Sequence, residues 1–244
     1  DPNGWTRDTA QRLLVEKRTA ARIPAVGAAL REIATKGGNP LGRLHALWTL
    51  EGSGALDPAT TLAALDDKDP RIVAAGLRLA ELFFTKPEGE KLEDRAMALV
   101  AARAEPAIRL QLALSLSEIR TPAADEALRA LVIAAGRQPY LADAVVSGLT
   151  GGEARFVEAL ANDPDAAGNS VDAVRFAASA VMKSGKAGDI EYTLAIAAAD
   201  NTPEWARSAI LAGVGHFLPK SPEGKVFAGT LPLEPKPLLA LAER

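Results

Sequence analysis

A polar residue followed by proline recurs along this chain, and this pairing constrains the fold more than any other feature. The pairs are Asn39-Pro40, Asp57-Pro58, Asp69-Pro70, Glu105-Pro106, Thr121-Pro122, Gln138-Pro139 and Thr202-Pro203. Proline suits the first position of a helix because the N–H group that it lacks has no partner there, and a preceding Asp, Asn or Thr caps the turn. Each pair therefore predicts a helix start, although Glu105 and Gln138 are weaker caps.

The spacing of these starts predicts a repeat. The starts at positions 39, 69, 105, 138 and 202 are separated by 30, 36, 33 and 64 residues, and Ser170-Val171 falls at the midpoint of the last gap. A unit of this length is typical of two-helix solenoid repeats. We expect six full hairpins and a further first helix over 202–218. The second helices are expected at 23–36, 58–65, 88–103, 122–135, 152–161 and 187–199.

An arginine follows the start of most first helices by about one turn. The four positions are Arg43, Arg109, Arg175 and Arg207, each followed by Ala and Leu at spacings of three and four. The unit that opens at Gln138 departs from this pattern, with Ala142 where the arginine would stand. The recurrence predicts a structural role that these repeats share.

Composition supports an all-α chain and excludes several kinds of site. Hydrophobic residues make up 48% and aromatics 5% of the 244 residues, and the abundant Ala and Leu are strong helix formers that let helices pack closely. The chain has no cysteine, which excludes thiolate catalysis, cysteine-bound zinc, c-type haem attachment and disulfides within it. No apolar run approaches the roughly 20 residues that a membrane span needs.

The charge of the chain argues against a nucleic-acid-binding protein. The formal net charge is −3 and the isoelectric point is about 5.6, whereas nucleic-acid-binding domains usually carry a basic face. The first 48 residues hold eight basic and four acidic residues, a bias that is more often a solvated face than a nucleic-acid site.

The C-terminal residues differ in character from the repeats. Five prolines and two glycines lie between positions 219 and 237, a composition typical of a semi-rigid connector. We therefore expect a repeat array over 1–218 and a Pro-rich tail, cap or linker over 219–244. The chain begins with Asp-Pro rather than Met, so we expect a fragment or a processed piece.

Candidate catalytic and metal-binding groups have simpler interpretations. His45 and His216 are the only histidines; we interpret His45 as a helix-flank residue that contacts the neighbouring hairpin and His216 as a C-terminal helix residue. The carboxylates of Asp66, Asp67 and Asp69, and those of Asp163 and Asp165, precede helices, where they cap free N–H groups. The sequence predicts no catalytic, cofactor-binding or metal-binding residue, and hence no cofactor.

Two tryptophans receive opposite interpretations. Trp48 shares a helical stripe with Leu41 and Leu44 and is predicted to lie in the core. Trp5 shares its stripe with polar residues, and together with Arg7 and Arg12 it is the candidate protein-contact site. The competing interpretation is that Trp5 covers the exposed end of the first hairpin, because terminal repeats often differ from internal ones.

Two segments carry a family resemblance: the first sixteen residues, DPNGWTRDTAQRLLVE, and the later PLGRLHALWTLEG from Pro40. The chain resembles the HEAT-repeat region of large bacterial secreted dehydrogenase-like proteins, in which a β-propeller precedes the repeats and a c-type cytochrome domain follows. The resemblance implies a spacer or docking module outside the cytoplasm, periplasmic or secreted. The redox groups of that family have no matching positions here.

These observations predict an all-α, armadillo-like fold: a right-handed α-α superhelix, or HEAT-like α-solenoid, of six to seven hairpins. The predicted function is a non-catalytic scaffold for protein–protein interaction, whose partner is another protein or a neighbouring domain of the same polypeptide. One alternative is a HEAT-like enzyme that resembles bilin lyases or alkylpurine DNA glycosylases. The other is a nucleic-acid-binding repeat protein that uses its basic first hairpins.

Overall fold

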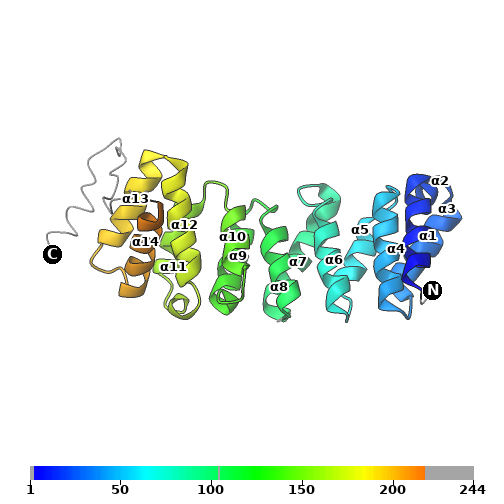
Figure 1. Cartoon of the computed structure of the whole chain (residues 1–244), viewed down its shortest axis with the longest axis horizontal. Helices are drawn as coiled ribbons and strands as arrows, with labels where there is room; N and C mark the ends of the chain where they lie inside the picture. Colours follow the sequence, from blue (N-terminus) through cyan, green and yellow to red (C-terminus); the bar gives the residue numbers. More distant parts are fainter. Residues whose placement is uncertain (1–2, 104, 218–244) are drawn as a thin grey trace. The chain divides into compact units, whose positions relative to one another are not determined.

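The computed structural model describes residues 3–103 and 105–217, and it is helical throughout without a strand in those ranges (Figure 1). The α-helices of this part are α1 Gly4–Glu16, α2 Thr19–Arg22, α3 Pro24–Lys36, α4 Pro40–Gly52, α5 Pro58–Leu65, α6 Pro70–Ala80, α7 Glu90–Ala102, α8 Pro106–Leu116, α9 Pro122–Ala135, α10 Leu141–Gly148, α11 Glu153–Ala161, α12 Val171–Ser184, α13 Ala187–Ala198 and α14 Glu204–Phe217. Two 3₁₀ turns, Pro87–Gly89 and Ala166–Gly168, complete the order. The all-α prediction is confirmed, and the tail expected over 219–244 lies outside the described residues.

Most helices begin where the proline pairs predict. Asn39, Asp57 and Asp69 each accept a backbone N–H from the first turn of α4, α5 and α6, at 2.8 to 3.0 Å. Thr121 accepts the Ala124 N–H at 3.2 Å at the start of α9. Glu105 makes no such capping hydrogen bond, in keeping with its weaker capping chemistry.

The structure departs from the predicted boundaries at three places. The helix expected from Pro139 begins at Leu141, because Tyr140 has a φ of 66° and cannot continue a right-handed helix. The second helix expected over 88–103 is split into a 3₁₀ turn and α7. The four-residue helix α2 has no counterpart in the predicted repeat.

The chain divides into two compact units, Asp1–Ala124 and Asp125–Arg244. In the first, α1, α4, α6 and α8 pack side by side, and α3, α5 and α7 form a second row (Figure 1). The second helix of each hairpin also packs against the first helix of the next, α3 on α4 and α5 on α6. Each hairpin of this unit therefore buries its apolar stripe largely against its neighbours.

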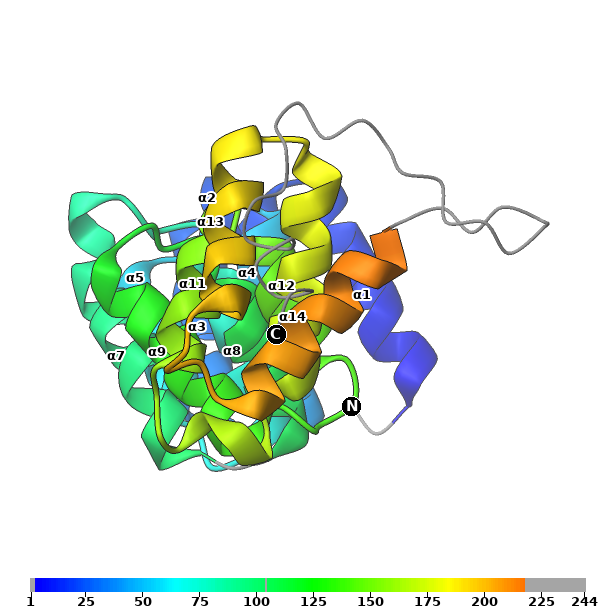
Figure 2. The ribbon, with the colours of Figure 1, turned by 90° about the vertical axis from the view of Figure 1, so that its left-hand side faces the viewer.

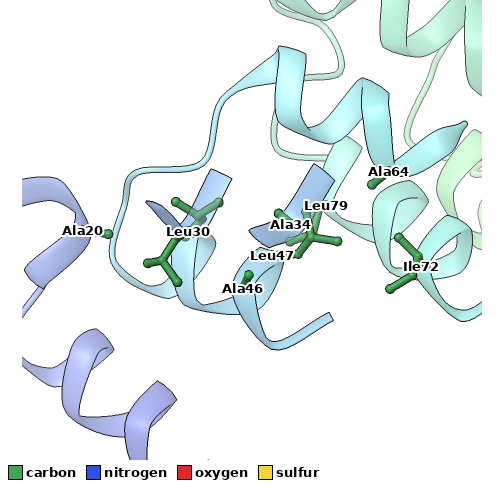
Figure 3. Close-up of a cluster of buried hydrophobic side chains, with 9 residues drawn as sticks. Ala20, Leu30, Ala34, Ala46, Leu47, Ala64, Ile72 and Leu79 are labelled. Atoms are coloured by element: carbon green, nitrogen blue, oxygen red, sulfur yellow. The ribbon is translucent and has the colours of Figure 1, made fainter. Parts of the chain in front are cut away.

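One cluster in the core of the first unit is aliphatic (Figure 3). Its buried members are Ala20, Leu30, Ala34, Ala46, Leu47, Leu50, Ala64, Ile72 and Leu79. Burial of one Leu or Ile side chain stabilises the fold by roughly 1.5–3 kcal/mol. Trp48 packs against this cluster but is only half-buried, and Leu41 is exposed. The stripe predicted for α4 therefore lies at the edge of the core, and Leu47 and Leu50 occupy its centre.

In the second unit, α10, α12 and α14 pack in order, and α11 packs against α12 and α13. Figure 2 shows α12 and α14 side by side. Their backbones approach closely at Gly213, where an added Cβ would lie 2.3 Å from the carbonyl oxygen of Arg175. Glycine is required there because any side chain would meet the backbone of α12. None of the helices in the described ranges is both long and apolar enough to cross a membrane.

Candidate protein-contact surface

Helix α1 is bound to the rest of the first unit along one flank only. Asn3 caps it by accepting the Trp5 N–H at 3.0 Å, and none of its residues is buried. The inner flank packs on α4, where the His45 Nδ1 lies 2.7 Å from the Gln11 Oε1. The His45 Nε2 lies 3.8 Å from the Asp8 Oδ1. The interpretation of His45 as a residue that contacts the neighbouring hairpin is confirmed.

The outer flank of α1 carries Trp5 and Arg12. Trp5 is 74% exposed, and the Arg12 side chain is 67% exposed and forms a 3.9 Å ion pair with Glu16. Residues seven apart lie about 20° apart around a helix, so Trp5 and Arg12 share this flank. Arg7 is half-buried and lies towards the inner flank. The structure therefore brings two of the three predicted contact residues together and places Arg7 apart from them.

The exposure of Trp5 bears on its two interpretations. A ring that covered the end of the first hairpin would lose most of its accessible surface, whereas three quarters of Trp5 remains accessible. Large exposed aromatic side chains are enriched among the residues that dominate protein–protein binding energy. The geometry thus favours a contact residue over a covering residue.

Arg43 holds two loops of the first unit together. It is only 5% exposed, its Nη1 donates to the Gly37 carbonyl at 2.8 Å, and its Nη2 donates to the Asp67 Oδ1 at 3.0 Å. The Asp67 carboxylate also accepts the Asp69 N–H at 2.8 Å. One guanidinium therefore joins the loop before α4 to the loop before α6.

Similar links occur along the same unit and were missed from the sequence. Arg31 donates to Asp57 at 2.5 Å, Arg95 donates to Asp66 at 2.6 Å, and Arg103 donates to the Asp67 carbonyl at 3.1 Å. These arginines lie on or next to second helices, where the search for a repeated first-helix arginine did not look. The signal that could have found them is the acidic loop residues, which need cationic partners if they are partly buried.

The electrostatics of these loops lower two carboxyl pKa values. The hydrogen bonds from the Arg71 guanidinium hold the pKa of Asp69 at about 2, against the opposing effect of burial. Burial raises the pKa of Asp57, but the Thr60 N–H and the Arg31 guanidinium outweigh it, and the net pKa lies below 3.8. Both carboxylates are therefore stabilised in their charged form.

The other repeated arginines differ in their contacts. Arg207 donates to the Ala199 carbonyl at 2.9 Å, just before its own helix, much as Arg43 does. Arg175 instead forms an ion pair of 2.8 Å with Asp172 on the same helix and lies 4.4 Å over the ring of Phe176. The Nε of Arg109, like those of Arg43 and Arg207, has no hydrogen-bond partner among the described residues. A role shared by all four repeats stays a prediction.

One polar cluster has the residue types of a catalytic site but not the access. The Ser115 hydroxyl donates to the Glu81 carboxylate at 2.7 Å and accepts from the Gln111 amide at 3.0 Å. Arg78 completes the cluster through its contact with Glu81. Ser115 has no accessible surface, so a substrate cannot reach its hydroxyl. The cluster joins α6 to α8 as a structural link.

The two clusters of aspartates that the sequence singled out cap helices or stabilise turns and loops. Asp66, Asp67 and Asp69 take part in the capping and ion pairs above, and Asp163 accepts the Asp165 N–H at 2.9 Å in a turn. Within 3–103 and 105–217 no group of three or more His, Asp or Glu residues is arranged to hold a metal ion. His216 lies in the last turn of α14, where a basic residue suits the free carbonyls.

Comparison with known proteins leaves the geometry as the main guide to function. Searches against protein-family models, curated proteins and solved structures find no significant match to this chain.

Proposed function

We propose that this chain is a non-catalytic HEAT-like α-solenoid that docks a protein partner, or a neighbouring domain of its own polypeptide, through the outer flank of α1. The observation that carries the proposal is the 74% exposed Trp5 on a helix that has no buried residue. The first and second helices of the first unit pack in two rows, which supports a repeat architecture. Arrays of this kind present extended helical surfaces to partners.

The resemblance to secreted propeller, HEAT and cytochrome proteins supplies the setting of the proposal. The setting that we propose from it is outside the cytoplasm, periplasmic or secreted, where the chain would serve as a spacer or docking module of a larger redox protein. The absence of cysteine from the sequence is consistent with a module that carries no c-type haem itself. No cofactor belongs to the proposed role.

Photo-cross-linking tests the contact surface. A photoreactive phenylalanine derivative replaces Trp5 in one variant and Tyr140, which is 75% exposed, in a matched control. Both variants are irradiated in extracts of the source cells. We expect one defined protein to cross-link through position 5 and not through position 140. Equal cross-linking from both positions would show that exposure alone explains the contact.

Assay of the purified chain separates the scaffold from an enzyme. We expect metal analysis, absorption spectra and extraction of small molecules to find no stoichiometric haem, metal or quinone. A stoichiometric cofactor in the purified chain would contradict the scaffold role and favour the enzyme alternative. Retention on DNA or RNA that falls as salt rises would favour the nucleic-acid alternative.

A further inference from the structure

A second surface lies at the other end of α1, and it is basic. Residues 17–31 contain four basic residues and no acidic residue. Arg31 is used by Asp57, whereas Lys17, Arg18 and Arg22 are exposed, and we find no ion pair for these three among the described residues. Three cations at this end of the first unit are therefore available to a ligand.

Two exposed aliphatic residues flank these cations in the sequence. Leu13 is 44% exposed and Ile23 is 48% exposed. Backbone hydrogen bonds hold the segment in a compact turn, from the Lys17 N–H to the Leu13 carbonyl at 3.3 Å and from the Arg22 N–H to the Arg18 carbonyl at 3.1 Å. We call these five residues, Leu13, Lys17, Arg18, Arg22 and Ile23, the basic end surface.

Arg18 lies between α1 and α2, in the middle of the segment that forms the basic end surface. Its φ of 48° turns the chain from α1 into α2, and its Nη2 lies 3.4 Å from the position a Cβ would take on Gly54, just after α4. A cation near the C-terminus of a helix is stabilising by a few tenths of a kcal/mol up to about 1 kcal/mol. That effect accounts for Arg18, but it does not account for the two exposed aliphatic residues that flank it in the sequence.

We propose that the basic end surface binds a short acidic segment of a protein partner, with aliphatic residues of that segment on Leu13 and Ile23. The inference rests on the proposed docking function but concerns a separate surface, whose nearest residue Leu13 lies about 12 Å along α1 from Trp5 and whose Lys17 lies about 18 Å from it, at 1.5 Å per residue. Opposite charge supplies attraction and orientation, and the aliphatic contacts add burial of apolar area.

Charge distribution favours an acidic segment over a larger polyanion. Electrostatic interactions in physiological salt fade over about 8 Å, so a short segment experiences chiefly these three cations and the neighbouring Arg12–Glu16 ion pair, whose opposite charges offset each other. A nucleic acid or an anionic bilayer extends further and also experiences the rest of the chain, where acidic residues outnumber basic residues. The chain as a whole carries a net charge of −3, which disfavours binding to such surfaces.

The probe is a short fluorescent peptide in which glutamate alternates with leucine, and its twin has glutamine in place of each glutamate. Fluorescence anisotropy measures binding to the full chain at low and high salt. We expect the glutamate peptide to bind roughly tenfold more tightly than its twin, from three partly exposed charge contacts. The difference should shrink as salt rises.

Matched charge reversals locate the binding. Lys17→Glu with Arg22→Glu should weaken the glutamate peptide about tenfold, whereas Lys183→Glu with Lys186→Glu, at exposed positions of the second unit, should leave its affinity unchanged although the net charge falls equally. Trp5→Ala should also leave it unchanged. A lack of cross-linking at position 5 would therefore contradict the proposed function, whereas a lack of peptide binding would contradict the role of the basic end surface. Circular dichroism confirms that each variant is folded.

Four results would overturn the proposal. The glutamate and glutamine peptides could bind equally, which would exclude a charge contribution. Both pairs of charge reversals could weaken peptide binding equally, which would show that only the net charge of the chain matters. Vesicles with anionic lipid, or single-stranded DNA, could bind the chain more tightly than the peptide and depend on Lys17 and Arg22. Sedimentation could show that the chain associates with itself and that the Lys17 and Arg22 reversals abolish this, which would make a second copy the occupant.

Discussion

The ion pairs of the two units differ in how far apart in the sequence their members lie. In the first unit, arginines on helices bind loop aspartates far away in the sequence: Arg43 binds Asp67, 24 residues away, and Arg95 binds Asp66, 29 residues away. In the second, the ion pairs Arg129–Glu126 and Arg175–Asp172 join residues three apart on one helix. Its long-range links include hydrogen bonds from the Asn169 amide to the Ile133 carbonyl, at 2.7 Å, and between the side chains of Tyr192 and Glu158.

Close approaches at glycines occur in both units. In the second unit they lie at Gly213 and at Gly136, where a Cβ would lie 2.3 Å from the Asn169 carbonyl oxygen, and in the first unit at Gly89, where a Cβ would meet the Phe83 carbonyl oxygen. Close backbone contact leaves no space for a side chain and depends little on solvent. Ion pairs depend on pH and on salt. The first unit, with its long-range ion pairs, should therefore respond more strongly to acid and to salt than the second.

The largest effect is expected from Arg43→Met. Removal of one member of a buried ion pair leaves the other uncompensated and typically costs about 3–5 kcal/mol, here at a side chain only 5% exposed. Fluorescence of Trp48 during urea unfolding, in a Trp5→Phe and Trp205→Phe background, reports the first unit. Arg175→Met is the control, because its ion pair is within one helix and should cost below about 1 kcal/mol. If Arg43→Met and Arg175→Met lowered the unfolding free energy equally, the proposed difference between the ion pairs of the two units would be contradicted.

Gly213→Ala should destabilise the second unit by about 1–3 kcal/mol, because its methyl group would meet the backbone of α12. Trp205 fluorescence during urea unfolding, with Trp5 and Trp48 both replaced by Phe, measures this. Gly188→Ala is the matched control, since it lies in α13 with nothing within 4 Å of an added Cβ, and it should be neutral or stabilising. A neutral Gly213→Ala would show that α12 and α14 can separate without cost.

Acid should weaken the first unit before the second. The Asp57 and Asp69 carboxyls have folded-state pKa values below 3.8, about 2 for Asp69. A lowered carboxyl pKa adds stability at pH values above the unfolded value, and that stability is lost as pH falls through 3.8 towards 2. The urea midpoint from Trp48 should therefore fall more steeply with acid than the midpoint from Trp205. Asp69→Asn should reduce the difference; if it does not, other carboxylates carry the acid sensitivity.

The smallest effect on stability is expected at Arg12. Its ion pair with Glu16 is long and largely exposed, so Arg12→Ala should change the unfolding free energy of the first unit by at most about 0.5 kcal/mol. The variant therefore isolates a binding role. Weaker partner binding with unchanged stability would support the outer flank of α1, whereas a large stability loss would make Arg12 a structural residue.

Local chemistry made the helices predictable from the sequence. The Asn39, Asp57 and Asp69 caps depend on neighbouring residues only, and the helices start where those caps predict. The failure at Pro139 has a local cause that the sequence does not reveal, because Tyr140 adopts a left-handed conformation that is uncommon for a residue other than glycine.

The candidate site was less predictable because it depends on packing between repeats. Trp5 was identified as a residue on a polar flank, but its exposure follows from where α1 lies on α4. The basic end surface was missed because it contains α2, which breaks the repeat pattern. The partners of Arg31 and Arg95 lie 26 and 29 residues away, and a search within one hairpin does not detect such pairs.

The central claim, that the outer flank of α1 is buried by a protein partner, has one direct test. Trp48→Phe and Trp205→Phe leave Trp5 as the sole tryptophan, and its emission is recorded as the partner identified by cross-linking is added. We predict a shift to shorter wavelength that saturates with the partner, because the exposed ring leaves water. A partner that binds while the Trp5 emission stays that of a water-exposed indole would contradict the claim.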